Sequence, residues 1–142
     1  MTGLIAADRD SVLEIFATRI AAAGVVERAE EVRDALIARE EAHTTSMGQG
    51  MALPHATIPG LSKPILMVAT APEAIPYGPD ESGAVRLFFV LLSPPGHESH
   101  HIKLLARICR LARLKSFVDG ILEGESADQV NEVILRVDQE HV

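Results

Sequence analysis

His55 is the residue whose surroundings in the sequence most strongly indicate chemistry. It ends the segment Gly48-Gln49-Gly50-Met51-Ala52-Leu53-Pro54-His55, in which a glycine turn leads into a short apolar run and a proline. Glycine permits backbone conformations that are closed to other residues, and proline fixes φ and removes a hydrogen-bond donor. We therefore expect the His55 imidazole at the end of a sheet element, on backbone with little freedom to move. The ordinary alternative is a turn histidine that only caps a strand.

Arg39 is a second candidate, because helical spacing directs this cation toward the protein core. It lies three residues after Leu36 and seven after Val32, so it continues the apolar stripe of a predicted helix. The alternative is an arginine whose stem is packed while its guanidinium stays in water.

His101 is the third candidate and shares the core face of another predicted helix with Leu105 and Ile108. If Ser99 caps that helix, His101 lies in its first turn, where free backbone N–H groups and the helix dipole favour an anion. A half-buried histidine with no role in chemistry is the alternative.

The other reactive side chains and the glycine turn give weaker indications of a functional site than the three candidates above. His97, His100 and His101 have side chains that suit zinc or copper, but no nearby carboxylate or cysteine completes a ligand set, so no metal site is expected. Cys109 falls among apolar residues in the middle of a helix, which predicts packing. The Gly48-x-Gly50 turn lacks the further glycines of a nucleotide-binding loop.

The elements that must position these residues alternate between helices and strands. An apolar stripe beginning with a cap at Asp10 or Ser11 predicts a first helix that ends at Gly24. Further helices are predicted at 27–41, from about 99 (with Ile102, Leu105, Ile108 and Ala112 inward), at 117–122 and after 126, and strands at 63–70 and 85–92, with a proline-rich loop through Pro79. This order predicts one α/β domain spanning 1–142, a layered sandwich with a mixed central sheet flanked by helices.

Composition bounds the class of protein. The 142 residues are 47% apolar and 23% charged, which is typical of a soluble globular domain, and no apolar run could span a bilayer. The first residues lack the basic start and apolar core of a signal peptide, and a single cysteine agrees with a reducing compartment. We therefore expect a cytoplasmic protein without direct membrane insertion. The net charge of −7 and the absence of a basic run argue against nucleic-acid binding.

Taken in order, the motifs resemble the enzyme IIA domain of the fructose/mannitol class, which belongs to the bacterial phosphoenolpyruvate-dependent sugar phosphotransferase system (PTS). The resemblance covers nearly the whole chain and includes nitrogen-regulatory IIA-like proteins. It rests on Arg39-Glu40, Thr44-Thr45, Gly48-x-Gly50-Met51-Ala52-Leu53-Pro54-His55, Ile75-Pro76-Tyr77 and His101-Ile102-x-x-Leu105.

The resemblance implies a role for each candidate residue. His55 matches the phosphorylated histidine, which accepts a phosphoryl group from the histidine carrier protein HPr or a paralogue. His101 matches a second histidine that steadies the phosphate, Arg39 matches the residue that compensates its charge, and Thr45 matches a nearby hydroxyl. No cofactor or metal is implied, because the donor is already a phosphohistidine. The family implies Nε2 as the phosphorylated atom, but the residues alone leave the choice of nitrogen open.

Three functions remain to be distinguished. A histidine phosphocarrier could regulate target proteins, as in the nitrogen branch, or hand phosphate to a IIB domain for sugar uptake. A chain without attached transport modules leans toward the regulatory role. A IIA-like module that binds partners without phosphorylation is the alternative from another class. For docking, we expect an apolar patch around His55 formed by Met47, Met51 and Leu61.

Overall fold

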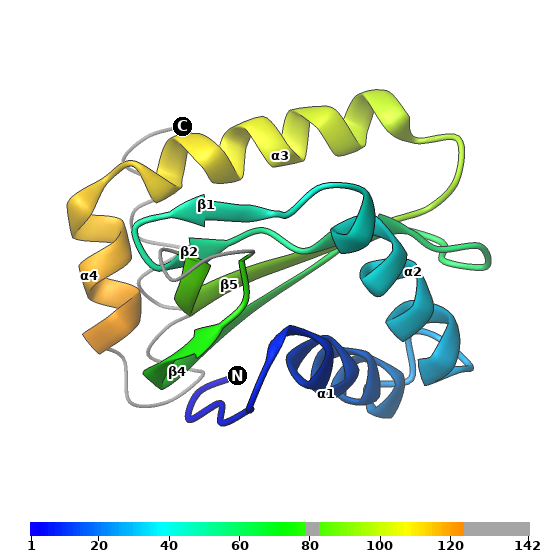
Figure 1. Cartoon of the computed structure of the whole chain (residues 1–142). Coiled ribbons are helices and arrows are strands. Elements are labelled where there is room, and N and C mark those ends of the chain that lie inside the picture. Colours follow the sequence, from blue (N-terminus) through cyan, green and yellow to red (C-terminus); the bar gives the residue numbers. More distant parts are fainter. Residues whose placement is uncertain (79–82, 124–142) are drawn as a thin grey trace.

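A computed structural model describes residues 1–78 and 83–123, which form a five-stranded mixed sheet between two pairs of helices. The elements are α1 (Arg9–Ala22), α2 (Ala29–Ala42), β1 (Ser46–Gly48), β2 (Met51–Ala52), β3 (His55–Thr57), β4 (Ile65–Pro76), β5 (Ala84–Ser93), α3 (Glu98–Ala112) and α4 (Lys115–Glu123). In Figure 1, α1 and α2 lie on one side of the sheet and α3 runs along the other. The predicted α/β sandwich with a mixed sheet is confirmed. The helix predicted after 126 lies outside the described residues.

The strand β5 is the centre of the sheet. It pairs with β4 antiparallel along one edge and with β2 and β3 parallel along the other, while β1 pairs with β2 antiparallel. All of Leu87–Leu92 is buried, as expected for a strand covered on both faces. The predicted buried central strand is therefore confirmed.

The strands β2 and β3 behave as one strand interrupted at Leu53-Pro54. Met51 is in register with Leu87 and His55 with Leu91, so the segment follows β5 on both sides of the break. The Leu91 amide donates to the Pro54 carbonyl across it. His55 consequently begins a strand and does not end one, which corrects the sequence expectation. The preceding turn is tight, since Gly48, Gln49 and Gly50 all have φ near the left-handed region (57–78°).

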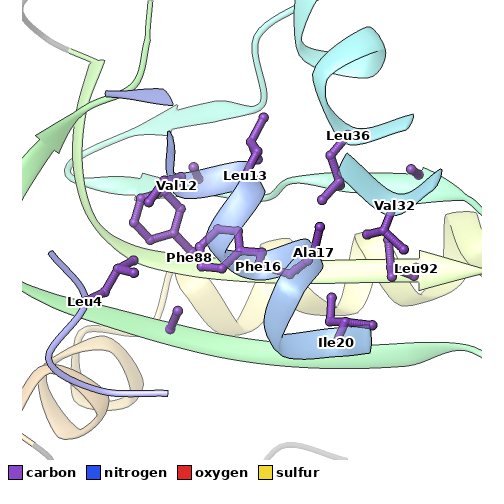
Figure 2. Close-up of a cluster of buried hydrophobic side chains, with 14 of the residues drawn as sticks. Leu4, Val12, Leu13, Phe16, Ala17, Ile20, Val32, Leu36, Phe88 and Leu92 are labelled. Atoms are coloured by element: carbon purple, nitrogen blue, oxygen red, sulfur yellow. The ribbon is translucent and has the colours of Figure 1, made fainter. Parts of the chain in front are cut away.

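Two apolar clusters hold the helices against the sheet. On one face, α1 and α2 pack on β5, and the Phe16 and Phe88 rings meet edge to face with centroids 5.2 Å apart (Figure 2). On the other, Ile108 and Phe117 of α3 and α4 pack against Leu87, Phe89 and Leu91. Because successive residues of β5 point to opposite faces, one strand contributes to both clusters.

Several predicted boundaries and faces were wrong. Asp8, not Asp10 or Ser11, caps α1, because its carboxylate accepts a hydrogen bond from the Ser11 amide. The strand β4 continues to Pro76, where a loop was predicted, because residues beyond an irregularity pair again with β5 at Ile75. The cap of α3 is His97 and not Ser99.

The predicted inward stripe of α3 was also partly wrong. Ile102 is 64% exposed, whereas Leu104, which was not among the predicted inward residues, packs against the cluster formed with Phe89 and Phe117. The buried residues Ile108 and Ala112 set the inward direction of this helix, and Ile102 points away from it at 100° per residue.

One buried and one exposed isoleucine allow a matched test of which helix faces pack into the core. Replacing Ile20 (4% exposed, labelled in Figure 2) with alanine should lower the free energy of unfolding by about 2–4 kcal/mol, because a cavity is left among packed side chains. The control Ile102→Ala, in an exposed helical position, should change it by less than about 0.5 kcal/mol. Denaturant unfolding of both variants measures this. Equal losses would contradict the assigned faces.

Candidate functional site

His55 lies where the sheet edge, α2 and α3 meet. The next residue, Ala56, packs into the cluster under α1 and α2. Side chains alternate along a strand, so the His55 side chain points to the opposite face, toward α3. Its ring is 5.4 Å from the ring of His101, between centroids, at an angle of 48°. Two histidines that are 46 positions apart in the sequence thus become neighbours.

Arg39 reaches the same place from the last turn of α2. Its Nε donates to His55 Nε2 at 3.3 Å, and its Nη1 donates to the His43 carbonyl at 2.7 Å. The second bond anchors the guanidinium to backbone just beyond the helix end. Arg39 is half-buried, and the residue on the fully buried stripe with Val32 and Leu36 is Glu40, at i+4 from Leu36. Arg39 therefore lies at the edge of the core, as its spacing from Val32 and Leu36 predicted, although the fully buried stripe itself runs through Glu40.

The hydrogen bonds of His55 determine which nitrogen can react. Nδ1 lies 2.8 Å from the Leu53 carbonyl oxygen. A carbonyl only accepts, so Nδ1 carries the proton of the neutral ring, and Nε2 presents a lone pair, which Arg39 faces. Nε2 is therefore the ring nitrogen that carries the lone pair, and the Leu53-Pro54 break supplies the carbonyl that fixes this tautomer.

His101 lies in the fourth position of α3, and its amide donates to the His97 carbonyl at 2.9 Å. The expectation that His101 lies among free amides was therefore wrong, since the helix begins earlier than predicted. Its side chain instead meets Ser93, the last residue of β5, with Nδ1 and Oγ 2.6 Å apart. Sequence reasoning did not single out Ser93.

Burial lowers the pKa of both histidines and so favours their neutral forms. The pKa of His55 is lowered by burial and also by the positive charge of Arg39, against opposing effects of the Leu53 carbonyl and Glu40. The pKa of His101 is lowered by burial and by His55. A neutral imidazole is the form with a nucleophilic lone pair, so the site is prepared to react without first losing a proton.

Thr45 lies in a buried polar trio with Glu40 and Tyr77. The Glu40 carboxylate accepts hydrogen bonds from the Thr45 amide at 2.9 Å, from the Thr45 hydroxyl and from the Tyr77 hydroxyl at 2.5 Å. Burial and the neighbouring Glu40 raise the pKa of Tyr77. The trio ties the segment after α2 to the end of β4. It thereby fixes the backbone on which Arg39 and His43 lie.

The spacing 32–36–40 was the signal that could have found Glu40 in advance, because it is the regular i+4 continuation of an apolar face. A carboxylate on such a face requires buried donors, and these come from distant residues. A surface cavity of about 750 Å³ lies beside the trio, but Asp8, Asp10, Glu40 and Glu41 line it, so its charge does not suit a phosphate.

The predicted apolar patch around His55 is not formed as expected. Met51 and Leu61 are each only 7% exposed and belong to the two core clusters, and Met47 is partly buried. Two large apolar side chains of the described residues are exposed at neighbouring positions: Ile102, which follows His101 in the sequence, and Leu66, which pairs with Leu91 as His55 does. Within residues 1–78 and 83–123, no three His, Cys, Asp or Glu side chains gather as a metal site. In the same part of the chain, no helix has the length and apolar character to cross a membrane.

The chain resembles known proteins over almost its whole length. Residues 2–137 match the family model described as "Phosphoenolpyruvate-dependent sugar phosphotransferase system, EIIA 2". The chain is a member of this EIIA type 2 family. The predicted family is confirmed.

Relatives of this EIIA chain have two kinds of name. A fructose-specific EIIA component of Haloferax volcanii is 28% identical over 131 residues, covering 92% of this chain and 85% of that protein. A nitrogen regulatory protein of Bradyrhizobium diazoefficiens is 32% identical over 126 residues, covering 89% and 81%. The structure of the complex of enzyme IIAMTL with phosphorylated enzyme IIBMTL from Escherichia coli is similar with a TM-score of 0.77 at 22% identity, covering 94% and 91%.

Replacing Arg39 tests the electrostatics of the site. Arg39→Gln should raise the His55 pKa, because a positive charge that opposes protonation is lost, while burial, the larger cause, still holds the pKa below the ordinary value of about 6.5. Histidine signals in an NMR pH titration measure this shift. Arg33→Gln, on the same helix and paired with Asp34, is the control and should leave the His55 pKa unchanged.

The same shifts predict how stability depends on pH. The histidine pKa values are lower in the folded chain than in the unfolded chain, so below about pH 6.5 the unfolded chain binds protons that the folded chain does not. The free energy of unfolding should therefore fall as the pH drops from 7 through this range. This contribution should become smaller in His101→Gln, as denaturant unfolding at several pH values would measure.

Glu40→Gln should lower the free energy of unfolding by about 1–3 kcal/mol, because an amide supplies one acceptor oxygen for donors that two carboxylate oxygens now satisfy. The exposed neighbour Glu41 gives the control Glu41→Gln, expected to change stability by less than about 0.5 kcal/mol. Thermal or denaturant unfolding distinguishes the two. Similar, small effects would mean that the trio contributes little to the fold.

Proposed function

We propose that this EIIA chain is a histidine phosphocarrier, which accepts a phosphoryl group on Nε2 of His55 from phosphorylated HPr or an HPr-like protein. The observation that carries the proposal is the state of His55: neutral, held by the Leu53 carbonyl through Nδ1, with its Nε2 lone pair facing Arg39 and His101 beside it. Membership of the EIIA type 2 family supports the same role.

The transfer step balances without a further reactant. The P–N bond of the donor phosphohistidine breaks, and its electron pair returns to the donor ring nitrogen. The lone pair of His55 Nε2 forms the new N–P bond, while the proton on Nδ1 stays where the Leu53 carbonyl holds it. Catalysis then depends on positioning and on neutralising the charge of the phosphoryl oxygens.

Arg39 supplies the positive charge for that neutralisation, and His101 supplies a hydrogen bond. The Arg39 N–H that donates to Nε2 in the free protein is close enough to pass to a phosphoryl oxygen once Nε2 is bonded to phosphorus. Its second bond, to the His43 carbonyl, holds the guanidinium in place during this exchange. His101 provides a second hydrogen bond from the α3 side. Charge-assisted contacts of this kind are stronger than neutral ones.

The carrier has two possible roles, which differ in the protein that receives the phosphoryl group. The regulatory role is our leading interpretation and is supported by the relative of 32% identity that is named a nitrogen regulatory protein. The sugar-transport role, with a IIB domain as recipient, is the alternative; the fructose-specific relative and the similar IIA structure solved with a phosphorylated IIB partner favour it. A panel of IIB domains challenged with the phosphorylated chain distinguishes them, because only the transport role requires rapid loss of phosphate to one of them.

His55→Ala should abolish phosphorylation, because no other nitrogen occupies its place beside Arg39. Incubation with phosphoenolpyruvate, enzyme I and HPr, followed by intact-mass measurement, should show one acid-labile phosphoryl group on the wild type. The control His100→Ala removes an exposed histidine next to His101 and should be labelled normally. If several HPr paralogues leave the wild type unlabelled, the proposal fails and the phosphorylation-independent binding module takes its place.

Variants of the two supporting residues should slow transfer without abolishing it. Arg39→Gln removes a charge that the transition state requires, and loss of one such contact costs about 2–4 kcal/mol, or roughly thirtyfold to a thousandfold in rate. His101→Ala should leave slow labelling but impair onward transfer. Rapid-quench measurement of both steps tests this, and normal rates in both variants would remove these residues from the site.

A further inference from the structure

Ser93 connects the two histidines through the end of one strand. Its backbone is in register with Thr57, two residues after His55, and its carbonyl accepts from the Ile58 amide at 2.9 Å. Its side chain, on a residue only 1% exposed, contacts His101 Nδ1 with 2.6 Å between the atoms. The same residue therefore fixes the strand that bears His55 and the ring of His101.

The direction of this hydrogen bond follows from burial. A hydroxyl hydrogen that is cut off from water needs an acceptor, because a buried donor left unpaired costs about 1–3 kcal/mol. In the described part of the chain, the hydrogen-bond partner of Ser93 Oγ is His101 Nδ1. The hydroxyl therefore donates, Nδ1 accepts, and the proton of the neutral His101 ring is on Nε2.

We propose that Ser93 is a positioning residue that holds His101 in the tautomer protonated on Nε2, the opposite of the tautomer that Leu53 imposes on His55. The site then contains one Nε2 lone pair, on His55, and one Nε2–H donor, on His101. This rests on the proposed phosphocarrier function, because the phosphoryl group on His55 is the acceptor for that donor.

The tautomer decides whether His101 assists the phosphate or repels it. With the proton on Nε2, the ring gives a hydrogen bond to a phosphoryl oxygen. With the proton on Nδ1, the same position would present a lone pair to an oxygen that already carries negative charge. An anchored ring in the wrong tautomer would therefore hinder transfer even though every residue of the site is present.

The first test measures the tautomer directly in the unphosphorylated wild type. Ring ¹⁵N chemical shifts and their couplings to ring protons should show His55 protonated on Nδ1 and His101 protonated on Nε2. A His101 signal of the Nδ1-protonated form would overturn the proposal. This result does not depend on phosphorylation. Failure of the phosphocarrier function would instead appear as absent labelling of His55.

The second test changes the hydroxyl. Ser93→Ala should convert the His101 signals to a mixture of tautomers and slow phosphoryl transfer about 10- to 100-fold, the effect of weakening one oriented donor. Ser93→Thr, which restores a hydroxyl, should return both the Nε2-protonated signal and most of the rate.

Thr70→Ala is the matched control, since it removes another nearly buried hydroxyl (7% exposed) from the same sheet, in β4. It should change neither the His101 signals nor the transfer rate. Thermal unfolding of all three variants shows whether each is folded. Normal tautomer signals and a normal rate in a folded Ser93→Ala variant would overturn the proposal.

Discussion

The central strand β5 is hydrogen-bonded along both edges and covered on both faces, and the positions of both histidines depend on it. Its parallel partner β3 places His55 opposite Leu91, near the end of β5, while its antiparallel partner β4 ends at Pro76, opposite Ala84 at the start of β5. The last residue, Ser93, contacts His101 as the chain leaves the sheet toward α3. If β5 shifted its register by one residue, Phe88 and Phe89 would exchange places between the two apolar clusters. Because such an exchange would disrupt the packing of both clusters, the residues attached to this strand are held in fixed positions.

The candidate site for a phosphoryl group lies in a protein whose net charge is −7. The chain carries 20 acidic and 13 basic side chains, so the overall charge of the protein does not attract a phosphoryl group. Selectivity must come from a few oriented donors. Arg39 is anchored at the end of α2 by the His43 carbonyl, and the buried Glu40 beside it is engaged by Thr45 and Tyr77. Because its oxygens accept from these donors, the carboxylate is fixed in place and does not turn toward the phosphate.

The hydrogen-bond partners of the two histidines determine which nitrogen of each ring carries the proton. Each ring is anchored through Nδ1, one by a carbonyl and the other by a hydroxyl. A carbonyl can only accept and a buried hydroxyl donates to what it meets, so similar rings receive opposite protonation patterns. In the phosphocarrier role that we propose, this arrangement would supply a nucleophile on His55 and a hydrogen-bond donor on His101. It uses no charged histidine, which agrees with the burial that lowers both pKa values.

Much of the element order was predictable from the sequence because it depends on local patterns. The apolar run of 85–92, the periodicity of the helices and the Gly48-to-His55 motif lie within short segments, and they predicted the central strand, the layered α/β sandwich and the residues to inspect. Boundaries that depend on long-range pairing, such as the extension of β4 to Pro76, were not predictable in this way. The same holds for the exposure of Ile102, which the packing of the rest of α3 against the sheet decides.

Only the tertiary structure could place Glu40 with Tyr77, and Ser93 with His101, because hydrogen bonds between distant residues leave no periodic signal in the chain. The sequence by itself therefore determined which side chains are candidates for the proposed phosphoryl transfer, while the fold decided which group each histidine meets through its Nδ1.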